Sequence, residues 1–97
     1  MSRSPISVPP DGQRITVDNG RLAVPDHPIL LWIEGDGIGP DIMRASMRIW
    51  DAAVQKVYGG QRRISWMEIY AGEKAARLYD GDYFPAESLQ AIREFQV

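Results

Sequence analysis

The residues with the clearest chemical potential lie at positions 34–40, which read Glu-Gly-Asp-Gly-Ile-Gly-Pro. The two carboxylates, Glu34 and Asp36, could bind a cation or act as an acid and a base. The glycines allow positive φ angles and leave space for a bound group. Carboxylates spaced two apart on a turn more often hydrogen-bond the N–H groups of that turn, so a structural role for this pair is the favoured interpretation.

The spacing of the glycines argues against two nucleotide-binding motifs. The dinucleotide fingerprint Gly-x-Gly-x-x-Gly matches at Gly35 and Gly37, but its third glycine falls at Pro40. The phosphate-loop pattern that ends in Gly-Lys-Ser/Thr is absent. The single histidine, His27, lies between two prolines on a polar connector and is interpreted as a solvated loop residue. One such histidine supports neither a Ser-His-Asp set nor a histidine-based metal site.

Two regular elements must position this glycine turn. The apolar run 29–33 does not alternate, which predicts a strand that is buried on both faces of a parallel sheet. Residues 42–58 carry two adjacent apolar stripes at helical spacing, which predict a helix with a wide apolar arc packed on the sheet. Pro40 suits the first helical turn, and Gly59-Gly60 suits its end. Strand-turn-helix connections of this kind lie at the carboxyl ends of strands, where ligands bind.

The elements before and after this unit complete an α/β fold. Residues 1–13 contain three prolines and no apolar period, which predicts a flexible arm. Residues 15–24 predict a β-hairpin about Asn19-Gly20 that pairs Val17 with Leu22 and whose apolar face must cover another element. A second strand over 64–70 completes a right-handed βαβ unit. A short helix over 73–79 follows, and then a last helix that begins at Pro85, with Leu89, Ile92 and Phe95 at helical spacing.

Composition narrows the class of protein without identifying a function. The chain has 97 residues, 44% of them hydrophobic and 25% charged, as in ordinary soluble domains. The net charge of −2 gives no electrostatic case for nucleic acid or for an anionic membrane. No apolar run reaches the length of a membrane span, and the first residues lack the apolar region of a secretory signal, so the expected location is cytoplasmic. The absence of cysteine excludes disulfides and thiolate metal sites.

Four stretches together resemble a known family. The turn from Gly35 to Pro40 resembles the amino-terminal loop of the β-decarboxylating dehydrogenases, which include isocitrate and isopropylmalate dehydrogenases. Residues 15–24, 64–74 and 85–94 resemble the bacterial NADP-dependent isocitrate dehydrogenases, and the Trp66-Met67 strand is the most specific piece. The resemblance runs from residue 15 to residue 97. It implies that residues 14–97 form an incomplete, amino-terminal part of the α/β domain of that family.

The resemblance implies a homodimeric enzyme that oxidises the hydroxyl of isocitrate, passes hydride to NADP and decarboxylates the product to 2-oxoglutarate with Mg or Mn. The family's catalytic, substrate and metal-binding residues would all follow Val97, so none is assigned here. Ile38 matches the isoleucine that lies near the nicotinamide ring, and Gly37 beside it is implied as a second cofactor-binding residue. NAD in place of NADP stays open, because the residues that would contact the 2′-phosphate would also follow Val97.

Two alternatives stay open from the sequence. The substrate could instead be that of an isopropylmalate-, tartrate- or homoisocitrate-type dehydrogenase, which the substrate-binding segment would decide. The chain could also be a truncated, non-catalytic interaction module. We expect the 97 residues alone to be inactive, because the family's catalytic residues would follow Val97, and marginally stable or prone to aggregation, because their βαβ unit lacks neighbouring strands. Reading the gene beyond Val97 distinguishes a continuing dehydrogenase from a short module.

Overall fold

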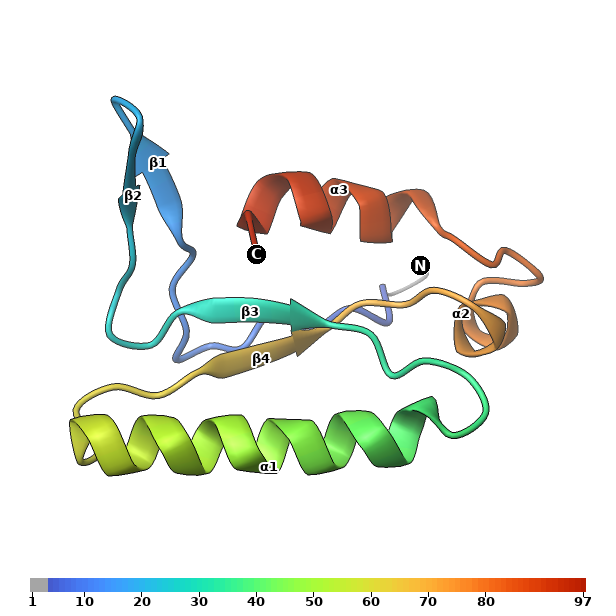
Figure 1. Cartoon of the computed structure of the whole chain (residues 1–97). Coiled ribbons are helices and arrows are strands. Elements are labelled where there is room, and N and C mark those ends of the chain that lie inside the picture. Colours follow the sequence, from blue (N-terminus) through green and yellow to red (C-terminus); the bar gives the residue numbers. More distant parts are fainter. Residues whose placement is uncertain (1–3) are drawn as a thin grey trace.

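The computed structural model describes residues 4–97 and confirms the predicted α/β class, a hairpin followed by a βαβ unit (Figure 1). The elements in chain order are β1 (Thr16–Asp18), β2 (Arg21–Ala23), β3 (Ile29–Trp32), α1 (Gly39–Tyr58), β4 (Ser65–Glu68), α2 (Glu73–Leu78) and α3 (Ala86–Phe95). In Figure 1 the parallel pair β3 and β4 lies between α1 on one side and α3 on the other. The carboxyl ends of both strands therefore point toward α2 and the turn that leads into α1.

The hairpin has the predicted register but not the predicted packing. β1 and β2 pair antiparallel with Val17 opposite Leu22, and Asn19 and Gly20 both have positive φ angles, 52° and 74°. The apolar side chains of this pair were expected to cover another element. Ile15, on the same face at the base of the hairpin, is buried, but Val17 and Leu22 are more than half exposed, because the hairpin stands away from the sheet (Figure 1).

The parallel pair holds the centre of the core. β3 and β4 are aligned from Ile29 opposite Ser65 to Trp32 opposite Glu68. Only Ile29 of β3 is fully buried; the other three residues of the strand are half-buried, since a sheet of two strands is covered only in part. One cluster joins the sheet to α3 and consists of Ile29, Met67, Ile69, Ala91 and Phe95.

Helix α1 is covered along one stripe only. Met43, Met47 and Val54 are half-buried, whereas the neighbouring stripe of Ile42, Ile49 and Val57 is 57–72% exposed. The predicted apolar arc of α1 is wider than the sheet on which it packs. Two strands about 5 Å apart form a surface that is narrower than a helix with its side chains. Gly59 ends the helix as predicted, in a left-handed conformation with its N–H donating to Gln55 O at 2.8 Å. Within residues 4–97 no helix, α1 included, combines the length and apolar content that crossing a membrane requires.

Helix α3 buries only part of the stripe that the sequence predicted. Phe95 is buried as expected, but Leu89 and Ile92 are 39% and 41% exposed. The buried residues are Ser88, Ala91 and Phe95. Hydrogen bonds of Ser88 explain this orientation. Its hydroxyl donates to Tyr70 O at 2.6 Å and accepts from Tyr70 N–H at 3.1 Å. These bonds turn the face of α3 that carries Ser88 and Ala91 toward the sheet.

The predicted arm, residues 1–13, lies along the sheet in its described part, and its first three residues lie outside that part. Ile6 packs against the core cluster, and the Tyr70 hydroxyl donates to Pro5 O at 3.3 Å. Gly12 fits closely, since a Cβ there would lie 2.6 Å from Cγ1 of Ile29. The flexibility of this arm stays a prediction, which hydrogen exchange over residues 4–13 would measure.

Candidate functional site

The glycine turn occupies the carboxyl edge of the sheet, between β3 and α1 (Figure 1). Gly35 and Gly37 have positive φ angles of 83° and 60°, which only glycine adopts freely. Ile38 follows as the N-cap residue of α1 and is 76% exposed. The structure therefore places both predicted cofactor-binding residues, Gly37 and Ile38, on an open surface at the edge where ligands bind in such sheets.

Asp36 has a structural role, but not with the partner that the sequence indicated. Its carboxylate accepts from the N–H of Glu73, the first residue of α2, at 3.1 and 3.4 Å. Within the turn, the N–H of Gly39 is already bonded to Asp36 O at 2.9 Å, so the side chain reaches outward. Gly72 makes this approach possible, because a Cβ on it would lie 2.6 Å from Oδ2 of Asp36.

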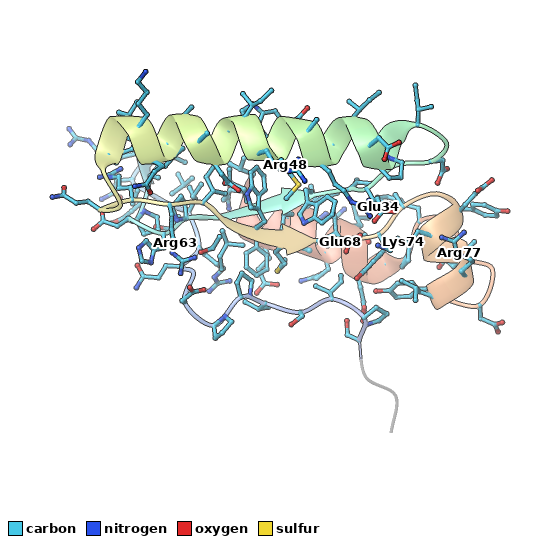
Figure 2. The ribbon with its side chains drawn as sticks, turned by 90° about the horizontal axis from the view of Figure 1, so that it is seen from below. Glu34, Arg48, Arg63, Glu68, Lys74 and Arg77 are labelled. Carbon is cyan, nitrogen blue, oxygen red and sulfur yellow. The ribbon has the colours of Figure 1, made fainter. Side chains whose placement is uncertain are left out.

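Glu34 belongs to a charge cluster at the same edge. Lys74 Nζ donates to Glu34 Oε2 at 2.8 Å and to Glu68 Oε2 at 2.7 Å. The three side chains lie together where the strands end (Figure 2) and are each 20–28% exposed. Ion pairs with this degree of burial are less screened than surface pairs. Residues 72–74 thus hold both carboxylates that flank Gly35.

The electrostatics of this cluster favour the charged forms of Glu34 and Lys74, since the pKa of Glu34 is lowered and that of Lys74 is raised. The hydrogen bond from Lys74 holds the pKa of Glu34 below its usual value, against a smaller opposing effect of burial. Burial works to lower the pKa of Lys74, but the hydrogen bonds to Glu34 and Glu68 outweigh it and the pKa is raised. A protonated lysine between two carboxylates is a stable connector rather than a proton donor or acceptor.

His27 does not lie at this edge of the sheet. His27 is half-buried and lies just before β3, at the opposite end of the strand from the turn, with Nδ1 3.4 Å from Asp11 O. Across residues 4–97, no three His, Cys, Asp or Glu side chains are grouped so that they could hold a metal ion. Glu34 and Asp36, the cation candidates from the sequence, are instead engaged with α2.

Sequence reasoning missed Glu68, Gly72 and Lys74 as partners of the turn. The position of Glu68 could have been predicted, because it ends a strand parallel to the one that precedes Glu34. Parallel strands bring their carboxyl ends to one edge of the sheet. The positive φ of Gly72 and the contact that excludes a side chain there are visible only in three dimensions.

Comparisons with known proteins identify the family of the chain. Residues 29–97 match the isocitrate/isopropylmalate dehydrogenase family. The chain is 55% identical over 93 residues to an NADP isocitrate dehydrogenase of Coxiella burnetii, and 50% identical over 99 residues to one of Pseudomonas aeruginosa. It is 49% identical over 98 residues to NADP isocitrate dehydrogenase 1 of a Psychrobacter species. These matches cover 95–100% of the chain but only 22–24% of each relative. The chain belongs to the isocitrate/isopropylmalate dehydrogenase family.

Proposed function

We propose that this chain forms part of an NADP-dependent isocitrate dehydrogenase, in which the hydroxyl of isocitrate loses hydride to NADP and the product decarboxylates to 2-oxoglutarate. The support is identity of about half the residues, spread over nearly the whole chain, to three proteins of that name. The chain spans less than a quarter of their length, and its described residues hold no group of side chains suited to a metal ion. We therefore expect these 97 residues alone to be inactive.

Within that enzyme, Ile38 would form one wall of the nicotinamide pocket. The single observation that carries this role is the exposure of Ile38, 76%, at the edge of the sheet where ligands bind. Exposing a large apolar side chain suits contact with the flat face of a ring, from which it would exclude water. Gly37, at φ 60°, brings the backbone to the same place without a side chain.

NADP would be the hydride acceptor. Among the residues of this chain, we propose that Gly37 and Ile38 contact it, at the nicotinamide ring. Mg or Mn would act as a Lewis acid on substrate oxygens. We expect the metal ligands outside this chain, since residues 4–97 provide no suitable group of carboxylates or histidines. We also propose that the complete enzyme is a cytoplasmic homodimer. Light scattering on the complete protein measures its oligomeric state.

A chimeric enzyme tests the proposal. This chain would replace the matching 93 residues of the Coxiella burnetii relative, and the rate of isocitrate-dependent NADPH formation would be measured. We expect an active chimera in which Ile38→Asp raises KM for NADP or lowers kcat by about tenfold or more, equivalent to ~1.4 kcal/mol or more.

Two further variants make the test specific. Ile38→Leu keeps an apolar wall and should stay close to the parent chimera. Ile49→Asp places the same charge on α1 at a residue that is 67% exposed, and should leave KM for NADP unchanged. Unchanged kinetics for Ile38→Asp would remove Ile38 from the cofactor site, and an inactive but folded chimera would count against the enzyme proposal.

A further inference from the structure

The turn that carries Ile38 has few contacts of its own. Gly35 and Gly37 both have positive φ angles, and glycine loses more backbone freedom than any other residue when it is fixed. A Cβ placed on Gly37 would meet nothing within 4 Å, and Ile38 is 76% exposed. A turn of this composition needs external contacts if it is to hold one conformation.

Those contacts come from the first two residues of α2, Glu73 and Lys74. Lys74 bonds Glu34 at 2.8 Å, on one side of Gly35, and the Glu73 N–H bonds Asp36 at 3.1 Å, on the other side. Both carboxylates next to the first glycine are therefore held from one short segment. The two attachments fix the direction in which the turn leaves β3.

Lys74 connects the turn to the sheet. Its second acceptor, Glu68, is the last residue of β4 and is aligned with Trp32 of β3 in the sheet. Its Nζ also lies 5.5 Å from the centre of the Tyr70 ring. The ammonium group thus bridges a strand residue and a turn residue, as Figure 2 shows.

Removing this ammonium would do more than delete two hydrogen bonds. Glu34 and Glu68 are both bonded to Nζ, and their side chains are only 20% and 21% exposed. Without the cation, two carboxylates would remain close together with little solvent screening, and like charges repel more strongly as the surroundings become less polar. Glu68 belongs to the hydrogen-bonded strand β4, whereas Glu34 lies beyond the end of β3, so we expect the turn rather than the strand to shift.

We propose that Lys74 is a positioning residue for hydride transfer: by joining Glu34 to Glu68 it holds the 34–39 turn so that Ile38 lies against the nicotinamide ring. This inference rests on the proposed function. It assigns Lys74 no contact with substrate or cofactor, and its effect passes through the turn.

The test uses Lys74→Met and Lys74→Arg in the chimeric enzyme described above. Lys74→Met should raise both KM for NADP and the dissociation constant of NADPH, measured by nicotinamide fluorescence, by about tenfold, while KM for isocitrate changes less than about threefold. Lys74→Arg keeps the charge and should restore both values to within about threefold of the parent. A purely structural lysine would lower thermal stability without separating the two KM values.

Control variants separate this effect from general loss of charge. Lys56→Met removes the other lysine of the chain, which is exposed in the last turn of α1. Arg14→Met breaks an exposed ion pair with Glu94. Both should leave KM for NADP unchanged, and an equal rise in either control would overturn the inference.

Two outcomes decide between the inference and the function on which it rests. If Ile38→Asp impairs NADP use and Lys74→Met does not, the positioning role is wrong and the proposed function stands. If neither variant changes NADP use, the cofactor role of the turn itself fails. Should Lys74→Met not fold, the isosteric Glu34→Gln replaces it: a rise of about threefold in KM for NADP supports the inference, and an unchanged KM overturns it.

Discussion

Replacing Gly72 by alanine should break the attachment of the turn to α2. Gly72 has φ 85° and ψ −150°, a region that is essentially restricted to glycine, so alanine there costs ~1–3 kcal/mol in backbone strain. Its Cβ would also lie 2.6 Å from Oδ2 of Asp36, which must then give up the Glu73 N–H. That charged but solvent-exposed hydrogen bond contributes ~1.5 kcal/mol. The total is about 2.5–4.5 kcal/mol of local stability.

Hydrogen exchange of residues 70–79 in the chimeric enzyme measures this loss directly, because it reports local opening. A cost of about 2.5–4.5 kcal/mol corresponds to amide exchange that is about 70- to 2000-fold faster. Gly81→Ala is the matched control, since Gly81 also has a positive φ, +91°, but open space at its Cβ position. If Gly72→Ala exchanges no faster than Gly81→Ala, the attachment through Asp36 is wrong. The same conclusion follows if Asp36→Ala adds its full cost on top of Gly72→Ala.

Three further predictions concern the scaffold of the site. Ser88→Ala removes both hydrogen bonds of a fully buried hydroxyl to the backbone of Tyr70, and should lower the free energy of unfolding by ~1–3 kcal/mol in urea titrations; no change would contradict the packing of α3. Gly12→Ala should cost ~1–3 kcal/mol by overpacking, because its Cβ would lie 2.6 Å from Ile29, and an unchanged melting temperature would contradict this close fit. The pKa of Glu34 is held below 4.5 by its hydrogen-bonded ammonium partner, so Glu34→Gln should be less stable than the parent above pH 4.5, and this difference should vanish as the pH falls below that value; a pH-independent difference would refute it.

The local features of the fold were predictable because short-range chemistry determines them. Asn19-Gly20 indicates a hairpin with one register, since few other residue pairs adopt two consecutive positive φ angles, and Val17 does face Leu22. The βαβ order follows from an apolar run, a helical period and a second strand pattern, and Gly59 ends α1 as expected.

The predictions that failed concern which surfaces are covered. Periodicity identifies an apolar stripe on a helix, but the elements that cover it are distant in sequence. For this reason Ile49 of α1 and Leu89 of α3 lie exposed although both belong to expected apolar faces. In α3 the hydrogen bonds of Ser88 to Tyr70 decided the buried face, and no apolar period contains that information.

The candidate site likewise combines residues that the sequence could indicate with partners that only the three-dimensional structure shows. Gly37 and Ile38 could be selected from the family resemblance and both lie exposed, while their contact with the cofactor stays a prediction. The partners of Glu34 and Asp36 depend on the juxtaposition of the turn with α2, which lies 37–40 residues away in the chain. Without the position of α2, the favoured partners were the turn's own N–H groups.

The contact between Ile38 and the nicotinamide ring can be measured by NMR on the chimeric enzyme with labelled isoleucine methyl groups. The δ1-methyl signal of Ile38, assigned through its loss in Ile38→Leu, should shift on addition of NADP and show nuclear Overhauser effects to the nicotinamide protons. Exposed isoleucines on α1, such as Ile49, should show neither. An Ile38 signal that is unchanged at saturating NADP would contradict the central claim that this turn forms a wall of the cofactor pocket.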